Sequence, residues 1–150
     1  MTSANIRKAQ AKDWPAIERL LQGAGLPVDD LDESGLEHFL VALDTVATPP
    51  SVNGAIGLQA FGSAGLLRSL VVDPGSRAAG IGRQLVQALE EQALAAGLTE
   101  LWLLTVDAEV FFWKLDYRIV DRGKAPASIQ GTREFTSLCP GSAHLMHKPL

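Results

Sequence analysis

Residues 77–83 have the types and the spacing that could bind an anion. They read Arg-Ala-Ala-Gly-Ile-Gly-Arg and stand between an apolar run and an amphipathic stretch, which predicts a strand, a turn and the start of a helix. The first-turn amides of a helix have no acceptor within it, and the positive end of the helix dipole favours negative charge there. Gly80 and Gly82 would let a bulky phosphate come close to the backbone, and Arg77 would add a fork-shaped cation. A pyrophosphate fits such a site well.

Two glycines and one arginine also allow a simpler interpretation, a glycine-rich turn with an arginine on the surface. The segment differs from the dinucleotide-binding motif G-x-G-x-x-G, because it contains only one G-x-G and that lies at a different offset. The residues alone therefore indicate an anion site without naming its ligand.

The elements on either side of this segment would hold it in place. Upstream, residues 66–73 form a nearly continuous apolar run, typical of a strand that is buried on both faces. Downstream, residues 82–96 place apolar side chains at helical spacing, and Gly97 is the expected end of that helix. A second apolar strand at 98–104 completes a strand–helix–strand unit, which requires a parallel pair of strands.

The rest of the chain predicts an α/β or α+β domain with a mixed sheet. A helix is expected to begin after Asp13, which stands where an N-cap residue belongs. The other expected elements are a strand at 6–9, a weaker helical stretch at 31–39, meander strands at 38–43 and 54–61, a helix at 108–115, a strand at 117–121, a short helix within 127–138 and a last strand at 142–147. The 150 residues fit a single domain, 1–150.

Composition narrows the classes of function. A formal net charge of −4 and a pI near 5.3 give no electrostatic footprint for nucleic acid, so local geometry must hold any bound anion. The single cysteine, Cys139, excludes an intramolecular disulfide and a zinc site built from several cysteines. No apolar run approaches the ~20 residues needed to span a bilayer, and the first residues lack a signal-peptide core. We expect a cytoplasmic protein without a metal, a nucleic-acid partner or a membrane partner.

The motif Arg77-x-x-Gly80-x-Gly82 resembles the acetyl-CoA-binding motif of the GNAT superfamily of N-acyltransferases. It follows Val72-Asp73-Pro74 and precedes an amphipathic helix, as in that superfamily. The resemblance covers nearly the whole chain, from the opening strand and helix to Leu115-Asp116-Tyr117. It implies a GNAT-like fold, in which helices flank a central sheet that splays open between the two strands of the strand–helix–strand unit.

The resemblance also implies which residues would bind the cosubstrate. The pantetheine arm of acetyl-CoA would enter the gap in the sheet and pair with the backbone of Leu70, Val71 and Val72. The backbone amides of consecutive residues would hold the pyrophosphate, namely those of Arg77, Ala78, Ala79, Gly80, Ile81, Gly82 and Arg83. The amine would attack the thioester directly while both reactants are bound, and an N–H near Val71 or Val72 would stabilise the developing oxyanion.

Three positions depart from the family pattern. Where many members carry a glutamate as general base, this sequence has Arg68; where many carry a tyrosine as general acid, it has Phe112, which cannot donate a proton. The asparagine often found at the end of the second splayed strand is replaced by Thr105. Arg68 either binds an anionic substrate group or is a strand residue with an ordinary salt-bridge partner. Phe112 is either part of the core or a wall of the cofactor site.

The catalytic residues therefore stay unknown, with Arg68 and His38 as candidates. His38 begins a predicted strand, and an imidazole with a pKa near neutrality would suit deprotonation of an amine. His147 is expected to be exposed. Arg133, in the tail, is a second candidate for binding a substrate anion beside Arg68.

Several stretches are similar to a narrower group, the acetyltransferases encoded with arsenic-resistance genes. These stretches are Leu66-Leu67-Arg68-Ser69-Leu70, Phe111-Phe112-x-x-Leu115-x-Tyr117, Ala125-Pro126-x-x-Ile129, Glu134-Phe135 and Leu138-Cys139-Pro140-x-Ser142. The similarity implies an amino-acid-like substrate with an oxyanion, such as an arsinic or phosphinic analogue of glutamate, which Arg68 could clamp.

Two functions of different classes stay open. The first is an active N-acetyltransferase that acts on a small-molecule amine and, as is common in the superfamily, forms a homodimer. The second is an acyl-CoA-binding regulatory or sensor protein that keeps the fold without turnover, which the missing glutamate and tyrosine favour.

Overall fold

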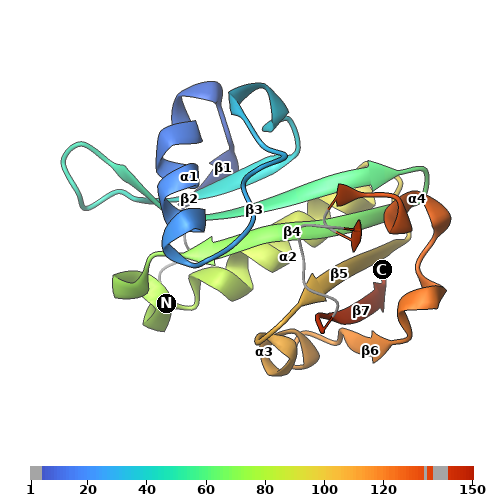
Figure 1. The fold of residues 1–150 in the computed structure, drawn as a ribbon. Coiled ribbons are helices and arrows are strands. Elements are labelled where there is room, and N and C mark those ends of the chain that lie inside the picture. Colours follow the sequence, from blue (N-terminus) through green and yellow to red (C-terminus); the bar gives the residue numbers. More distant parts are fainter. Residues whose placement is uncertain (1–4, 134, 137–141) are drawn as a thin grey trace. The chain divides into compact units, whose positions relative to one another are not determined.

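A computed structural model of the chain describes residues 5–133, 135–136 and 142–150, and for residues 77–79 it describes only the backbone. Within these residues the strands form one seven-stranded sheet in the order β1-β2-β3-β4-β5-β7-β6 (Figure 1). The strands are β1 (Asn5–Lys8), β2 (Phe39–Asp44), β3 (Ser51–Phe61), β4 (Ala64–Val72), β5 (Glu100–Thr105), β6 (Arg118–Val120) and β7 (His144–Pro149). The helices are α1 (Trp14–Gly23), α2 (Ile81–Ala95), α3 (Glu109–Trp113) and α4 (Ala127–Gln130).

Strand directions make the sheet mixed, which confirms the expected fold class. β2 runs antiparallel to both β1 and β3. β4 and β5, which α2 connects, are parallel and pair Ala64–Leu66 with Glu100–Trp102. β7 runs antiparallel to both of its neighbours, β5 and β6. The predicted strand–helix–strand unit with a parallel pair is therefore present.

Contacts within the chain divide it into two units, which are described in turn. The first consists of the residues up to Leu58 together with Ser69–Glu91, and the second of Gln59–Arg68 together with Gln92–Leu150. The single domain expected from chain length stays a prediction.

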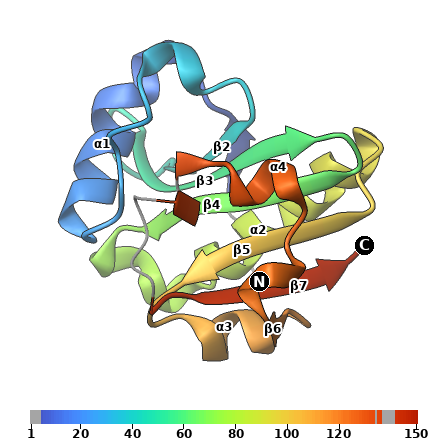
Figure 2. The same ribbon diagram turned by 45° about the vertical axis from the view of Figure 1, so that its right-hand side comes forward.

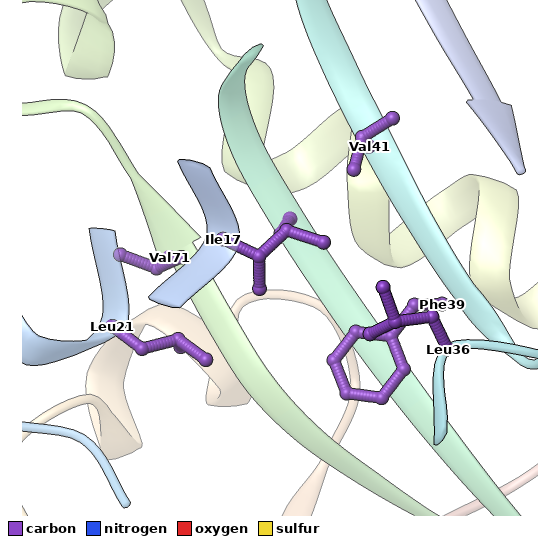
Figure 3. Packing of buried hydrophobic residues seen from close by; sticks show 7 residues of the cluster. Ile17, Leu21, Leu36, Phe39, Val41 and Val71 are labelled. Atoms are coloured by element: carbon purple, nitrogen blue, oxygen red, sulfur yellow. The ribbon is translucent and has the colours of Figure 1, made fainter. Parts of the chain in front are cut away.

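The core of the first unit lies between α1 and the strands β2, β3 and β4 (Figure 3). Its buried side chains are Ile17, Leu21, Leu36, Phe39, Val41, Ala55 and Val71. α2 covers the opposite face of these strands (Figures 1 and 3). Because Gly54 of β3 has no side chain, Ile81 and Leu85 of α2 come into close contact with the strand. Burial of apolar surface on both faces of β3 thus holds the start of α2 in place.

A second glycine of β3, Gly57, lies opposite Phe39 of β2. A Cβ atom at this position would stand 2.4 Å from Cζ of the Phe39 ring, a distance that real Cβ atoms do not adopt. Because residue 57 is glycine, the Phe39 ring occupies the space that a side chain there would fill.

The core of the second unit joins the β3–β4 hairpin, β5, β7 and α4, which lies beside the hairpin in both views (Figures 1 and 2). Its buried side chains are Ala64, Leu66, Trp102, Ala125, Ile129 and Leu145. On β5, Glu100 Oε1 accepts a hydrogen bond from Trp102 Nε1 at 3.0 Å and lies 2.9 Å from His147 Nε2 on β7. The expectation that His147 is exposed is therefore wrong, because this contact and the Trp102 ring hold it half-buried.

Two of the expected helices differ from the structure. The stretch 31–39 contains only a 3-10 helix at Glu33–Gly35, because the Asp32 carboxylate accepts the Ser34 backbone N–H and closes a tight turn. The tail helix expected within 127–138 is interrupted: α4 ends at Gln130, and after Gly131 and Thr132 the described residues Arg133, Phe135 and Thr136 are helical again. Its expected continuation reaches residues 134, 137 and 138, which lie outside the described part of the chain.

Asp13 precedes α1 as expected but does not cap it with its side chain. Its carboxylate instead binds the Arg7 guanidinium at two points, 2.7 and 3.0 Å, and accepts the Gln10 backbone N–H at 2.7 Å. Chiefly through the hydrogen bond from Arg7, the pKa of the buried Asp13 carboxyl lies below its ordinary value. The ion pair thus ties β1 to the start of α1.

We expect Asp13→Asn to lower the free energy of unfolding by about 2 kcal/mol at pH 7, because it leaves the Arg7 charge without its partner. A carboxyl with a depressed folded-state pKa stabilises the fold above its unfolded-state pKa of about 3.9, and this contribution is lost as pH falls through the lower folded-state value. Urea denaturation at pH 7, 5 and 3 should show the wild-type advantage at the first two and its decline at the third. Asp107→Asn, at an exposed position, is the matched control, and equal stability of the two variants at pH 7 would contradict the assignment.

Candidate functional site

The predicted order of strand, turn and helix is present around residues 72–84. β4 ends at Val72, and the Asp73 N–H donates to the Asn53 carbonyl oxygen at 2.8 Å. A 3-10 helix follows at Pro74–Ala79, and Gly80 then adopts the left-handed conformation at φ 73° and ψ 20°. Glycine takes this conformation without the Cβ penalty that other residues meet. Gly80 therefore redirects the chain from the turn into α2.

In the first turn of α2 the apolar side chain is buried, and the backbone amides lie at the N-terminus of the helix. The helical hydrogen bonding begins with the Gln84 N–H, which donates to the Gly80 oxygen at 3.2 Å. The amides of Ile81, Gly82 and Arg83 come before that bond, where an α-helix has no internal acceptor for them. Ile81 is buried and Arg83 is exposed. The arrangement suits an anion. The side chains of Arg77, Ala78 and Ala79 lie outside the description, so the cation expected from Arg77 stays a prediction.

Sequence reasoning missed the part that β3 takes in this site. Residues 48–54 predict a turn, whereas β3 already begins at Ser51. Between β2 and β3 the register shifts, so that Ala42 opposes Gly54 and Leu43 opposes Val52. Asn53 is the extra residue of this bulge, and its carbonyl oxygen holds Asp73. The Asn-Gly pair was the available signal, but it predicts a tight turn as readily as a bulge.

Arg68 lies inside the protein, with 3 % of its surface exposed, and it has an interaction partner within the chain. The next residue, Ser69, has a φ of 59°, in the left-handed region that residues with a Cβ rarely enter. This backbone reversal within β4 is the geometry of a bulge. Farther along β4, Val71 is buried, whereas Leu70 and Val72 are half-buried. A buried guanidinium with a partner in the chain suits a structural ion pair, and its further N–H donors suit an anion ligand as well.

Phe112 and Thr105 both contact other residues of the chain and stabilise its local structure. The Phe112 ring, 4 % exposed, packs edge-on against Phe111 and Tyr117, with ring centroids 5.0 and 5.5 Å away. Thr105 Oγ1 accepts the Ala108 N–H at 3.0 Å, which steadies the chain as it enters α3. This packing favours the core interpretation of Phe112.

The remaining candidates are exposed. His38 lies in a turn before β2, which begins at Phe39 rather than at His38. Arg133 is exposed and has an interaction partner in the chain. Among the described residues, no three or more His, Cys, Asp and Glu side chains gather in a way that could hold a metal ion. No helix in that same part of the chain is long and apolar enough to cross a membrane.

Solved structures with the same fold include acyltransferases crystallised with coenzyme A. The N-acetylglutamate synthase of Neisseria gonorrhoeae, in complex with coenzyme A and N-acetyl-glutamate, superimposes with a TM-score of 0.85 at 18% identity, over 100% of this chain and 36% of its own. The present chain thus spans about a third of that enzyme. Rv2747 of Mycobacterium tuberculosis, in complex with coenzyme A, gives a TM-score of 0.82 at 22% identity, over 97% of this chain and 99% of its own. The Ard1 protein of Thermoplasma volcanium gives 0.71 at 20% identity, over 99% of each chain.

At these identities the structures show the fold, and the sequence itself shows the family. A comparison with curated proteins gave no match. Residues 35–119, more than half of the chain, match the acetyltransferase (GNAT) domain family. The matched range contains the strand, the turn, the left-handed Gly80 and the first turn of α2. On this evidence the chain belongs to the GNAT acetyltransferase family.

Proposed function

We propose that this protein is an acetyl-CoA-dependent N-acetyltransferase that acetylates the amine of a small molecule. The observation that carries the proposal is the start of α2, where Gly80 turns the chain so that the amides of Ile81, Gly82 and Arg83 stand free of intrahelical bonds. Coenzyme A in the structures of N-acetylglutamate synthase and Rv2747 supports the choice of ligand.

The cosubstrate would be bound almost entirely by main-chain groups. The pyrophosphate would lie on the amides of residues 77–83. These local N–H donors would bind the anion although the net charge of the chain is negative. The pantetheine arm would pair with the backbone of residues 70–72, beyond Leu66, at which the register of β4 with β5 ends.

In the proposed reaction the amine nitrogen attacks the carbonyl carbon of the thioester. The C–N bond forms, the carbonyl oxygen gains negative charge, and the nitrogen loses its extra proton to water; the carbonyl then re-forms as the C–S bond breaks and coenzyme A leaves as the thiolate. A main-chain N–H near Val71 or Val72 would stabilise the oxyanion, and holding both reactants together supplies much of the rate. Since Phe112 has no hydroxyl to donate, the thiolate would leave without a proton from that position.

The acceptor, in this proposal, carries an anionic group beside its amine. Arg68 would bind that group in a charge-assisted hydrogen bond, with Arg133 as a second candidate. The likeness to acetyltransferases encoded with arsenic-resistance genes points to an oxyanion analogue of glutamate, in which arsenic or phosphorus replaces a carboxyl carbon.

We expect release of free thiol when the protein is incubated with acetyl-CoA and an acidic amino-acid-like amine. Arg68→Lys should lower kcat/KM for acidic amines by about tenfold or more, because a lysine cannot reproduce the two-point contact of a guanidinium. Its KM for acetyl-CoA should stay unchanged. Arg19→Lys, at an exposed position on α1, is the matched control.

Equal losses for acidic and neutral amines would assign Arg68 to the fold rather than to the acceptor. Binding of acetyl-CoA in calorimetry without thiol release from any amine would contradict turnover. That result would favour the sensor, for which replacement of the usual general base and acid by Arg68 and Phe112 is the supporting observation.

A further inference from the structure

Among the residues that the structure describes, three buried side-chain oxygens have no hydrogen-bond partner: Asn53 Oδ1, Gln59 Oε1 and Glu109 Oε2. A buried acceptor without a donor costs free energy, so such atoms in a folded protein need an explanation. Gln59 is the most informative of the three, because the hairpin that contains it also contains Arg68.

The turn between β3 and β4 fixes which side chains share a face. Two residues, Gly62 and Ser63, separate the strands, and Gly62 has a φ of 64°, as the first central position of a type II′ turn requires. A two-residue turn pairs Phe61 with Ala64 and therefore places Gln59 opposite Leu66. Arg68 follows Leu66 by two residues, so its side chain lies on the same face.

On that face the hairpin packs in the core of the second unit. Ala64 and Leu66 pack with Ala125 and Ile129, and Phe61 packs against the same cluster. α4 lies beside the hairpin (Figure 2). These apolar side chains supply no donor for an amide oxygen, and Gln59 Oε1 is buried without a hydrogen-bond partner.

The two polar groups on this face have complementary needs. Gln59 Oε1 accepts an N–H but cannot take a proton, and the Arg68 guanidinium offers five N–H donors, enough for more than one partner. Diagonal neighbours on paired strands lie about 7 to 8 Å apart at Cα, within reach of long side chains. A ligand that suits both groups carries an anionic oxygen and an N–H donor close together. α-Amino acids have this chemistry.

We propose that Gln59 is a specificity-determining residue of the acceptor site. Its Oε1 accepts a hydrogen bond from an N–H of an amino-acid-like amine whose anionic group binds at Arg68. This inference rests on the proposed N-acetyltransferase function and names the class of its acceptor more closely: an amine adjacent to an anionic group.

The test is calorimetric titration of L-glutamate, and separately of glutarate, which lacks the amino group, into protein saturated with coenzyme A. Gln59→Met conserves volume and removes the side-chain amide, so that the acceptor Oε1 is lost together with the Nε2 donors. We expect the affinity for L-glutamate to fall by about tenfold to a hundredfold, since an unmet N–H is left on the ligand. Affinities for glutarate and coenzyme A should stay unchanged. Gln22→Met, at an exposed position on α1, is the control.

The midpoint of thermal unfolding separates this role from a structural one. Because Oε1 has no partner in the free protein, Gln59→Met should not lower Tm. A lowered Tm, equal affinity of both proteins for L-glutamate, or parallel losses for L-glutamate and glutarate would each overturn the inference. A wild-type protein that binds coenzyme A but not L-glutamate would overturn it while leaving the acetyltransferase proposal intact. Failure of the wild type to bind coenzyme A would refute that proposal and this inference with it.

Discussion

Replacement of Gly82 by glutamate is expected to abolish binding of acetyl-CoA. Gly82 lies in the first turn of α2, where its backbone amide and those beside it would hold the pyrophosphate. A glutamate side chain would add bulk and negative charge against that group. Calorimetric titration with acetyl-CoA should show an affinity loss of at least about a hundredfold, as expected when like charges meet in a binding site.

The same replacement should leave the fold intact, which makes the result specific. Gly82 has a negative φ, since it is absent from the glycines with positive φ, and glutamate is a better helix former than glycine. A carboxylate in the first turn also interacts favourably with the helix dipole. Tm should therefore be unchanged or higher. Gly23→Glu, at the exposed end of α1, is the matched control, and unchanged acetyl-CoA affinity in Gly82→Glu would refute the assignment of the loop.

Replacement of Gly57 by alanine is expected to destabilise the protein by about 3 kcal/mol or more. The added Cβ would stand 2.4 to 2.7 Å from three atoms of the Phe39 ring, which is 2 % exposed and enclosed by the core. Overpacking of a filled core forces side chains out of their rotamers and shifts the backbone. Urea denaturation measures the loss. Gly23→Ala, where an added Cβ meets nothing within 4 Å, should not lower stability and should raise it by up to about 1 kcal/mol.

A double-mutant cycle with Phe39→Leu identifies the ring as the cause. Alone, Phe39→Leu leaves space and should cost about 1 to 2 kcal/mol. Combined with Gly57→Ala, it makes room for the new methyl group. The double variant should therefore be more stable than the sum of the single losses predicts, by about 1 kcal/mol or more. Additive losses would show that the Gly57 effect has another origin.

Sequence patterns predicted β4, α2 and β5 to within about three residues because their burial is simple. A strand buried on both faces is continuously apolar, and a helix on one face of a sheet shows helical spacing. The stretch 31–39 misled because Leu31, Leu36 and Phe39 do pack toward the core, as a helix pattern requires, but from a short turn and a strand. Local hydrogen bonding at Asp32, rather than periodicity, decided the backbone there.

The part of the candidate site that consists of backbone groups could be predicted from the sequence. The part that depends on contacts between distant residues could not. Gly80 adopts a left-handed conformation that glycine favours, so a glycine just before a predicted helix is a signal that can be seen in the sequence. Gln59 gives no such signal, because a glutamine in a strand is unremarkable until its register with Leu66 and Arg68 is fixed by the fold. The side chain of Asp13 was equally unpredictable. The sequence predicts that it caps α1, whereas in the fold its carboxylate binds Arg7 instead.

The position of β7 has a consequence for synthesis of the chain on the ribosome. β7 is the last strand in sequence, yet it lies between β5 and β6, which precede it. A nascent chain that has emerged only as far as β6 therefore exposes two strand edges that nothing yet joins, and such edges are prone to pair with other chains. Translation must reach His144–Pro149 before this half of the sheet can close.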